Sequence, residues 1–473
     1  MSHCAIVPPH LLDALAASGD PELAARARHV RAVDAELRRA RRTRGALPDE
    51  GATPDAPAVG GARSVHDAKG EQQLPGDLVR GEGDPATGDA AVDEAYDGLG
   101  ATRDFWRTVY GRDSLDGRGM GLVGTVHYGQ QYDNAFWDGS QMVFGDGDGV
   151  IFTRFTASLD VIGHELAHGV TELTSGLVYQ GQSGALNEHV SDVFGVLVKQ
   201  HHLGQDADAA DWLVGAELLA PGVQGRALRS MSEPGTAYDD PRMGNDPQPG
   251  HMDDFVVTSA DNGGVHINSG IPNRAFYLLA TALGGPAWER AGQIWVDTIL
   301  GDIRADCDFA RFAALTVVAA RARYDDEVAA QVLAAWQGVG VVPAEGEGTQ
   351  GPADEPAGGQ QPAPTHTTEL TLTRSGGVAG LVRRRTVTLG ELPDDDRTAL
   401  ASLLADPELA VYAAAEPSRP DSFCYGLSCD QPPLDVQVPE PVLPPSTRAL
   451  LDRTIAAGGP QSEPPGEPAV GQS

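Results

Sequence analysis

The sequence predicts an α+β protein built from more than one domain. The chain has 473 residues, of which 41% are hydrophobic, which exceeds one ordinary domain and suffices for a buried core. In the main body, residues 63–342, strand-like runs come first and helical patterns follow. We therefore expect a β-rich lobe, an α-helical lobe and a cleft where they meet. A small α/β module of roughly 90 residues is expected near the C-terminus.

The charge balance excludes several classes of partner. With 34 Lys and Arg against 67 Asp and Glu, the net charge is −33, so neither nucleic acid nor an anionic membrane is expected as the main partner. No stretch approaches the roughly 18 apolar residues of a membrane span. The first residues show no signal peptide, so we expect synthesis in the cytoplasm, and subsequent export by a non-classical route stays open. Four cysteines are too few for a disulfide scaffold, and whether Cys424 and Cys429 pair stays open.

Residues 1–45 predict two helical segments that begin with Pro8 and Pro9. One face of the second segment is apolar, and the other carries eight arginines, namely Arg26, Arg28, Arg31, Arg38, Arg39, Arg41, Arg42 and Arg44. This basic face is either an ordinary solvated helix surface or the side of an arm that docks on the acidic body. Residues 46–62 are rich in Pro, Gly and Ala, which predicts an exposed linker that is open to proteolysis.

The main body supports the two predicted lobes segment by segment. Three short runs have strand character: Met120 to Tyr128, Gln141 to Phe144, and Val150 to Phe155. Five later segments keep the 3.6-residue spacing of helices: Leu159 to Val170, His189 to Lys199, Pro272 to Leu283, Trp288 to Ile303, and Asp325 to Trp336.

A low-complexity segment separates the main body from the C-terminal module. Residues 343–366 consist mostly of Pro, Gly, Glu and Gln, which predicts a disordered spacer. Residues 367–458 then alternate strand and helix patterns, with strands from Thr367 to Arg374, Val382 to Leu389 and Ser422 to Ser428, and helices from Asp394 to Leu404 and Ser446 to Ile455. Residues 459–473 are rich in Pro and Gly and are expected to be disordered.

A metal site is predicted around the pentapeptide of residues 164–168, HELAH. His164 and His168 are four residues apart on a predicted helix, so both imidazoles can reach one metal ion. The pentapeptide alone would equally fit an ordinary helix surface. Glu188, however, lies 24 residues after His164 on the next helical segment and can supply the third ligand of an open tetrahedral zinc site. Asp192, one turn further, can accept the free N–H of a liganding histidine.

Five ordered sequence blocks resemble the thermolysin family of zinc metallopeptidases. They are HELAH at 164–168, GALNEHVSD at 184–192, NAFWDGSQM at 134–142, LRSM at 228–231 and DNGGVHINSG at 261–270. The resemblance covers residues 63–342 and implies a thermolysin-like, two-lobed catalytic domain with zinc in the cleft. It also implies proteins or peptides as substrates.

The resemblance implies a role for each matching residue. His164, His168 and Glu188 would bind Zn²⁺, with Asp192 supporting His164. Glu165 would act as general base toward the attacking water and then donate a proton to the leaving amine. Tyr179 and His266 would donate to the developing oxyanion, with Asp261 orienting His266. The Asn134 side chain, the Ala135 backbone and Arg229 would hold the substrate backbone.

The resemblance also places Phe152, Phe155, Val161 and Leu228 in the pocket after the scissile bond. All four side chains are apolar, so a large hydrophobic residue is expected there, although ordinary core positions would look the same. Calcium (Ca²⁺) is less expected: Asp160 matches a ligand of the family's double calcium site, but Lys199 stands where that site has a carboxylate. The lysine ammonium would take the place of a cation, so we expect this double site to be absent.

Both ends of the chain resemble regulatory segments. Residues 4–12, CAIVPPHLL, resemble the propeptide of the protealysin-like subgroup, which implies removal by autocatalytic cleavage within residues 46–62. Cys4 is either a small buried thiol or a thiolate that caps the zinc. Residues 370–380, LTLTRSGGVAG, together with a later Asp421-Ser422-Phe423, resemble emfourin, an inhibitor of protealysin-like enzymes. Tethered by about 24 residues, such a module would have a millimolar-scale effective concentration. A passive binding or solubility module is the alternative.

Three functions are therefore compared. The first is a zinc endopeptidase made as a self-processing precursor and restrained by its own C-terminal inhibitor-like domain. The second is a protease-derived binding protein whose active site is permanently closed. The third is a zinc hydrolase that acts on a non-peptide substrate, which the peptide-holding residues Asn134, Ala135 and Arg229 disfavour. Because every catalytic position of the family is occupied, we favour the first.

Overall fold

A five-stranded mixed sheet forms the β-rich lobe of the protein. The computed structural model describes residues 5–44, 62–344, 368–375, 383–404, 423–430, 433–439, 443 and 445–456. The sheet has the order β2-β1-β3-β5-β4, with β1–β3 and β3–β5 parallel and the outer pairs antiparallel. Its strands are β1 (Arg63–Asp67), β2 (Asp77–Gly81), β3 (Leu122–Val126), β4 (Ala135–Trp137) and β5 (Met142–Phe144). Because β4 lies at the edge of this sheet, its outer backbone groups can pair with a further extended segment.

A long helix, α3 (Ala90–Tyr110), packs against this sheet in a region where we predicted only strands. The Asp89 carboxylate caps its N-terminus by accepting the Ala91 and Val92 N–H groups, and Gly111 ends it with φ 65°. These are the ordinary signals of a helix start and stop. The prediction for this part of the lobe was therefore incomplete.

The strand predicted from Val150 to Phe155 was wrong. The Asp148 carboxylate accepts the N–H groups of Val150, Ile151 and Phe152 at 2.9, 2.8 and 2.9 Å. This local turn uses the backbone donors that a strand would need. Within the described residues, the segment keeps one isolated bridge, between Phe152 and Leu219.

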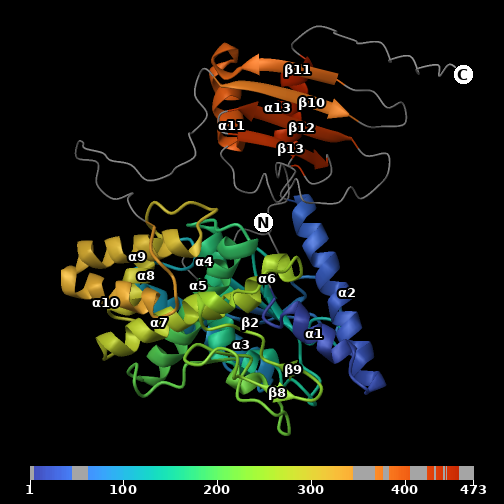
Figure 1. Cartoon of the computed structure of the whole chain (residues 1–473). Helices are drawn as coiled ribbons and strands as arrows, with labels where there is room; N and C mark the ends of the chain where they lie inside the picture. Colours follow the sequence, from blue (N-terminus) through green and yellow to red (C-terminus); the bar gives the residue numbers. More distant parts are fainter. Residues whose placement is uncertain are drawn as a thin grey trace, which may run out of the picture. The chain divides into compact units, whose positions relative to one another are not determined.

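The second lobe is helical, as predicted (Figure 1). Its helices are α4 (Leu159–Glu172), α5 (Gly181–Leu203), α6 (Asp261–Asn268), α7 (Gly270–Leu283), α8 (Ala291–Ile299), α9 (Phe309–Arg323) and α10 (Asp326–Gln337). Short strand pairs lie in the connections: β6 (Leu213–Val214) with β7 (Arg229–Ser230), and β8 (Asp239–Asp240) with β9 (Gly244–Asn245). Three 3-10 turns are also present: η1 (Phe155–Ala157), η2 (Ala216–Leu218) and η3 (Met252–Asp254).

The N-terminal segment joins the hydrophobic core of the two lobes. It contains the two predicted helices, α1 (Pro9–Ala16) and α2 (Pro21–Arg44). Its buried side chains belong to the same core cluster as the lobes and include Ile6, Val7, Leu11, Leu12, Leu15, Leu23 and Val30. The segment therefore docks by burying apolar surface, which is the main driving force for association. Cys4 and the linker residues 45–61 lie outside the described residues.

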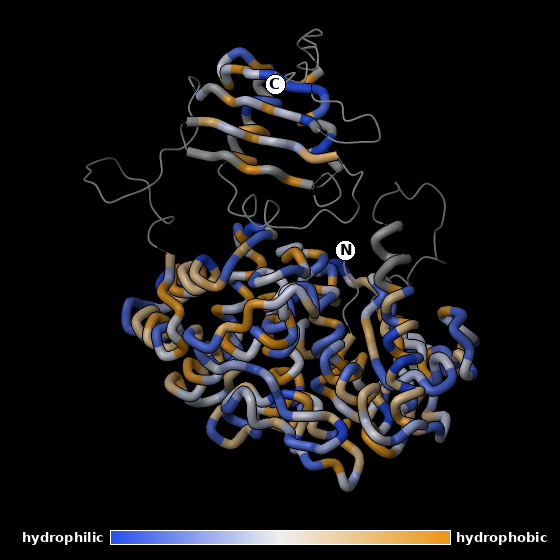
Figure 2. Tube along the Cα trace, turned by 45° about the vertical axis from the view of Figure 1, so that its right-hand side comes forward, coloured by the Kyte–Doolittle hydropathy of each residue, from blue (hydrophilic) through white to orange (hydrophobic). Residues whose placement is uncertain are grey.

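The C-terminal module forms a separate unit with its own hydrophobic core. Its antiparallel sheet has the order β11-β10-β12-β13, with strands β10 (Glu369–Ser375), β11 (Arg383–Thr388), β12 (Cys424–Asp430) and β13 (Pro433–Pro439). The helices α11 (Asp394–Leu404) and α13 (Pro445–Ala456) complete it, with the turn η4 (Leu389–Glu391). Figure 2 shows hydrophobic and hydrophilic residues in turn along these strands, as expected of a sheet with one buried face. Strand β13 was not predicted, and the spacer residues 345–367 and the tail 457–473 lie outside the described residues.

Two open questions about the chain have structural answers. Cys424 and Cys429 form no disulfide in the structure and lie toward opposite ends of β12. Five residues of strand span about 16 Å, whereas a disulfide needs Cα atoms within about 7 Å, so the two thiols do not pair with each other. Among the helices that the structure describes, none is long and apolar enough to cross a membrane.

Candidate active site and metal centre

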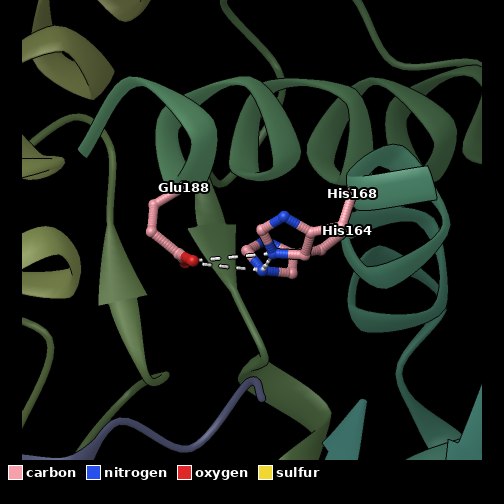
Figure 3. A group of neighbouring side chains, drawn as sticks. All are labelled: His164, His168 and Glu188. Carbon is pink, nitrogen blue, oxygen red and sulfur yellow. Dashed lines mark hydrogen bonds and ion pairs between the residues drawn. The ribbon is translucent and has the colours of Figure 1, made fainter. Parts of the chain in front are cut away.

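Three buried side chains from two crossing helices form a metal-binding cluster. His164 and His168 project from α4, and Glu188 projects from α5 toward them (Figure 3). One potential ligand atom from each residue lies within 4.8 Å of the others. The exposed fractions of the three residues are 0%, 7% and 1%. The structure thus assembles the predicted ligand set.

A pair of glycines lets α4 and α5 cross closely enough to build this cluster. A Cβ atom on Gly163 would lie 3.0 Å from the Gly195 Cα, and a Cβ on Gly195 would lie 2.3 Å from the Asp160 carbonyl oxygen. Any larger side chain at Gly195 would push the helices apart, because interiors are close-packed. The close approach at these two glycines therefore keeps α4 and α5 near enough for their side chains to meet at the cluster.

The hydrogen bonds around the histidines determine where their protons lie. His164 Nδ1 lies 2.8 Å from the Asp192 carboxylate, which only accepts. His168 Nδ1 lies 2.8 Å from Asn187 Oδ1, and the Asn187 amide donates to the Leu177 carbonyl at 3.0 Å. Both Nδ1 atoms therefore carry the proton, and both Nε2 atoms present lone pairs, 3.1 Å apart. Two facing lone pairs beside a carboxylate fit a bound cation, and this N₂O donor set suits zinc.

The protonation states of the ligands also suit a cation. Burial lowers the pKa of His168 to about 4, so its imidazole is neutral. Burial alone would raise the pKa of Glu188, but the charges of His266 and Arg229 lower it to about 2. Burial likewise opposes ionisation of Asp192, yet Arg229 and His164 hold the pKa of that carboxyl well below its usual range. The site thus presents a neutral imidazole at His168 and a carboxylate at Glu188.

Glu165, between the two histidines, is fully buried and faces the strand at the edge of the sheet. Its Oε2 accepts the Trp137 N–H at 3.0 Å. Burial raises the pKa of Glu165 well above its ordinary value, and the negative charge of Glu188 adds to this effect. A carboxyl group whose pKa is raised toward neutrality is suited to exchange protons with a reacting group.

Tyr179 and His266 meet at Glu188. The Tyr179 hydroxyl donates to Glu188 Oε1 and lies 3.2 Å from His266 Nε2. His266 Nδ1 contacts the Asp261 carboxylate at 2.7 Å. Burial opposes protonation of His266, but Asp261 and Glu188 outweigh it and raise its pKa. In the structure, the hydroxyl of Tyr179 is thus engaged by the Glu188 carboxylate itself.

A left-handed turn brings Asp261 back to His266. Four consecutive residues, Asp261 to Gly264, have φ values of 52°, 50°, 86° and 75°. A Cβ on Gly263 would also lie 3.0 Å from the Gly181 nitrogen. The two glycines allow this turn at low cost, and it lets Asp261 bind both the side chain and the backbone N–H of His266, the latter at 2.9 Å.

The predicted substrate-holding residues bind the backbone of the N-terminal segment. The Ile6 N–H donates to the Ala135 carbonyl at 3.1 Å. The Val7 N–H donates to Asn134 Oδ1 at 2.9 Å, and Asn134 Nδ2 donates back to the Val7 carbonyl at 3.3 Å. Arg229 Nη1 donates to the Ile6 carbonyl at 3.4 Å. The backbone of residues 6 and 7 therefore lies against the edge strand β4 and is bound by the groups predicted to hold a substrate backbone.

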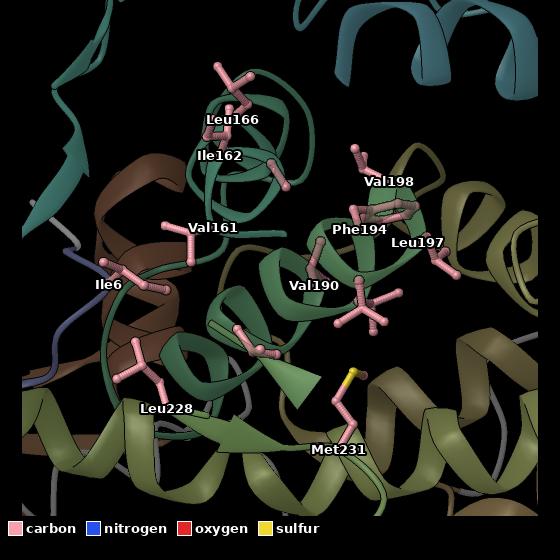
Figure 4. Close-up of a cluster of buried hydrophobic side chains, with 14 of the residues drawn as sticks. Ile6, Val161, Ile162, Leu166, Val190, Phe194, Leu197, Val198, Leu228 and Met231 are labelled. Atoms are coloured by element: carbon pink, nitrogen blue, oxygen red, sulfur yellow. The ribbon is translucent and has the colours of Figure 1, made fainter. Parts of the chain in front are cut away.

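The four predicted pocket residues are all buried and belong to one hydrophobic core cluster. Ile6 lies with Val161 and Leu228 in a hydrophobic cluster (Figure 4). Phe152 and Phe155 pack on each other, with ring centroids 5.6 Å apart. The structure therefore places Val161 and Leu228 near the Ile6 side chain, and whether the two phenylalanines line the same pocket stays a prediction.

Polar contacts also hold the N-terminal segment, and sequence reasoning missed most of them. Arg26 makes a bidentate pair with Asp133, at 2.6 and 2.8 Å. Asp34 is 2% exposed and accepts the Tyr132 hydroxyl at 2.7 Å and Asn134 Nδ2 at 3.1 Å. Arg31, from the same basic face, pairs with Asp13 inside the segment. Docking of the predicted arm thus relies on one arginine and on a buried aspartate that we had not singled out, while the side chains of residues 38–44 lie outside the described part.

Comparisons with known proteins agree with this geometry. Residues 58–172 match the family model for the thermolysin metallopeptidase catalytic domain, and residues 175–341 match the model for its alpha-helical domain. An extracellular metalloprotease of Pectobacterium carotovorum subsp. carotovorum is 55% identical over 343 residues, which cover 72% of this chain and 96% of that protein. The chain belongs to the thermolysin family of metallopeptidases. It is accordingly a zinc metalloprotease.

Further comparisons found a solved relative of this thermolysin-family chain, another similar protease and a family match in the C-terminal module. The solved precursor of protealysin, a metalloproteinase from Serratia proteamaculans, is 52% identical and superposes with a TM-score of 0.65 over 72% of this chain and all of that one. Protease PrtS from a Photorhabdus strain is 58% identical over 282 residues, 59% of this chain and 76% of that protein. Residues 372–455 match the emfourin family model. The chain thus carries an emfourin domain, and it is similar to a metalloproteinase whose precursor has been solved.

The expectation of a cytoplasmic protein was wrong. The Pectobacterium relative, which the chain matches over nearly its whole length, is named an extracellular metalloprotease. The sequence reasoning relied on the lack of a visible signal peptide, and that pattern does not decide where a member of this family acts.

Lys199 was predicted to replace the cation of the family's double calcium site. Its ammonium is 2.8 Å from Asp160 Oδ2, 3.2 Å from Asp211 Oδ1 and 2.7 Å from the Leu213 carbonyl. Burial opposes this charge, but Asp160, Asp211 and Glu217 raise the pKa of Lys199 above its ordinary value. The absence of the double calcium site stays a prediction.

Replacement of Lys199 by Met is expected to lower the free energy of unfolding by about 3 kcal/mol, because it leaves the buried Asp160 carboxylate without its cation. Urea unfolding of the full chain with Glu165→Gln, which prevents self-digestion, measures this loss. In the parent, 5 mM calcium and a calcium chelator should give the same midpoint. A midpoint that rises with calcium in the parent would contradict the role of Lys199 as the resident cation.

Proposed function

We propose that this metalloprotease is a self-processing endopeptidase whose N-terminal segment, residues 1–45, occupies its own substrate site until it is cleaved off within residues 46–62. The supporting observation is the seating of Ile6 and Val7. Their backbone groups are bound by Ala135, Asn134 and Arg229, the groups that the family resemblance assigns to substrate. We also propose that the mature enzyme acts outside the cell, as the name of the Pectobacterium relative indicates for that protein.

The site residues suggest a division of chemical work. When bound, zinc polarises the scissile carbonyl and lowers the pKa of water toward neutrality. Glu165 accepts a proton from the attacking water and passes it to the leaving amine. Tyr179 and His266 donate hydrogen bonds to the oxyanion, while Asp261 keeps His266 protonated and oriented. Asn134, Ala135 and Arg229 hold the peptide backbone extended, so that its carbonyl is presented to these groups.

The position of Ile6 supports a preference for a large hydrophobic residue after the scissile bond. Its side chain is 0% exposed and lies in the same hydrophobic cluster as Val161 and Leu228 (Figure 4). A substrate residue that takes this place must lose its hydration, which favours Leu or Phe over Asp by roughly tenfold or more. Phe152 and Phe155 form the adjoining wall in this proposal.

Intact-mass spectrometry of the purified full chain, followed over hours, tests the proposed processing. The expected result is loss of the first 45–62 residues, together with the appearance of casein hydrolysis. Peptides that differ only after the scissile bond should then be cleaved at least tenfold faster with Leu or Phe than with Asp or Gly. A chain that stays whole and inactive, even without its C-terminal module, would instead indicate a binding protein with a closed site.

Acid is expected to loosen the N-terminal segment through His10. This side chain lies 3.3 Å from the Tyr238 hydroxyl, and burial, with the nearby His266, lowers its pKa to about 4. Since a released His10 titrates near 6.5, docking has its full strength above pH 6.5 and weakens as the pH falls toward 4. At pH 5 the loss is at most about 2 kcal/mol. Hydrogen–deuterium exchange of residues 5–16 in the Glu165→Gln chain, corrected for intrinsic rates, measures it.

His10→Gln is the matched control for this effect, because it cannot gain a proton. Exchange of residues 5–16 should then change little between pH 7.5 and 5. If the acid-induced opening persists unchanged in His10→Gln, another group is responsible and the assignment to His10 is wrong.

We also propose that the emfourin domain restrains the protease in cis. A flexible tether of about 24 residues gives a millimolar-scale effective concentration. With an intrinsic dissociation constant of about 10–100 μM, only about 1–10% of molecules would be open. Deletion of residues 344–473 should therefore raise casein hydrolysis about 10–100-fold, measured at equal concentrations of processed enzyme. An unchanged rate would leave the module as a passive appendage.

A further inference from the structure

A chain of buried hydrogen bonds leads from the core of the helical lobe to the candidate metal ligand His164. Trp295 Nε1 on α8 donates to His189 Nε2 at 2.7 Å. His189 Nδ1 on α5 lies 2.8 Å from Asn273 Oδ1 on α7. Asn273 Nδ2 then donates to Asp192 Oδ2 at 2.8 Å. Asp192 Oδ1 in turn accepts the His164 Nδ1–H, so the chain joins three helices to the site.

Both ends of this chain determine the direction of every bond in it. The indole N–H of Trp295 only donates, so His189 Nε2 accepts and His189 carries its proton on Nδ1. That proton requires Asn273 Oδ1 as its acceptor, which leaves Asn273 Nδ2 as the donor toward Asp192. The ionised Asp192 carboxylate only accepts. All three relay residues are buried, and no alternative tautomer or amide orientation satisfies the same bonds.

Asn273 differs from the other groups that bind Asp192. Arg229 donates to Asp192 through Nε at 2.9 Å and Nη2 at 2.7 Å, but its Nη1 also reaches the Ile6 carbonyl. Arg229 therefore responds to whatever occupies the substrate site. His164, the third partner, is itself a candidate ligand. Asn273 contacts neither the N-terminal segment nor the ligands in any bond described, so it can hold Asp192 in place whichever state the cleft is in.

We propose that Trp295, His189 and Asn273 form a positioning relay that aims Asp192 at His164 and so sets how tightly the site holds zinc. This inference rests on the metal site proposed above. The relay keeps the His164 proton on Nδ1 and its Nε2 lone pair directed at the ligand cluster. A group that binds a ligand directly, as Asp192 binds His164, typically changes metal affinity 10–100-fold when removed, and the relay acts on zinc through this group. The three residues are thus positioning residues that act through Asp192.

Zinc affinity, measured by competition with a chromophoric chelator, tests the relay. The full chain with Glu165→Gln serves as parent. Asn273→Leu and His189→Phe each break the relay with an apolar side chain of similar volume. The expected result is a zinc dissociation constant up to about tenfold higher for Asn273→Leu, below the full effect of losing Asp192 itself, and several-fold higher for His189→Phe. His189→Gln, which can still accept from Trp295 and donate to Asn273, should recover most of the affinity.

Thr316→Val is the matched control. Thr316 Oγ1 accepts the Trp336 indole N–H at 2.9 Å, and Trp336 stacks on Trp295 with ring centroids 6.1 Å apart. This variant removes a buried indole hydrogen bond from the same aromatic cluster without touching the relay. Thermal unfolding of the zinc-free proteins shows whether the variants are similarly destabilised.

The outcomes separate the relay from the metal site. Selective loss of zinc affinity in the relay variants supports the proposal. Affinities within twofold of the parent, or an equal loss in Thr316→Val, overturn it while leaving the zinc site intact. A parent that binds no zinc overturns both.

Discussion

Replacement of Glu165 by Gln is expected to abolish both self-processing and the hydrolysis of added protein. General acid–base catalysis by a positioned side chain contributes about 10²–10⁴-fold, so kcat/KM should fall at least a hundredfold. The side chains have the same size, and the amide oxygen of Gln can still accept the Trp137 N–H that Glu165 accepts now. The variant should therefore keep its fold and its zinc. Intact mass, peptide hydrolysis and metal content measure the three expectations together.

Glu172→Gln is the control for this substitution, because Glu172 lies on the same helix, α4, two turns beyond Glu165. It changes the same charge at a site away from the metal cluster, and should process and hydrolyse like the wild type. If Glu165→Gln loses its N-terminal segment at the wild-type rate while binding zinc, Glu165 is not the base.

Removal of zinc is expected to have an effect at least as large. Without a cation, the Nε2 lone pairs of His164 and His168 face each other at 3.1 Å beside the ionised Glu188, an arrangement that leaves buried acceptors unsatisfied. A strong zinc chelator should abolish hydrolysis and lower the Tm, since a ligand that binds only the folded state stabilises it. One equivalent of zinc should restore both. Peptide hydrolysis and thermal unfolding, before and after zinc is returned, provide the measurement.

A calcium-selective chelator is the control for zinc removal. It should leave hydrolysis and the Tm unchanged, in keeping with the resident ammonium of Lys199. Recovery of full activity with magnesium or calcium instead of zinc would contradict the assignment, because hard cations prefer oxygen ligands to imidazole.

Local patterns carried much of the prediction. His164, Glu165 and His168 lie within one helix, so their relative positions follow from helix geometry alone. Glu188 and Asp192 are likewise one turn apart on α5. The helical lobe was predicted for the same reason, since its apolar spacing is regular. The long helix α3 was not predicted, although Asp89 and Gly111 mark its ends, because this half of the main body was predicted to be β-rich from its strand-like runs.

Other features depend on contacts between distant segments, and the sequence contains no local signal for them. Asn187 precedes a predicted ligand, but only the fold shows its side chain holding His168. The crossing of α4 and α5 depends on Gly163 and Gly195, which are 32 positions apart. Ile6 reaches Ala135 across 129 positions. In each case the partners are chosen by packing and not by spacing along the chain.

The sequence by itself therefore determined the α+β class, the family and the candidate metal-ligand set, and it predicts Glu165 as the base, because each of these depends on residue type and on periodicity within one element. Only the tertiary structure decided that Ile6 and Val7 bind the groups predicted to hold substrate. It also decided that the Lys199 ammonium pairs with Asp160 and Asp211, and that hydrogen bonds from Trp295 lead to His164. The physical reason is that these features arise where separate elements bury polar groups against one another. A buried polar group needs a partner, and the identity of that partner is settled when the chain is folded.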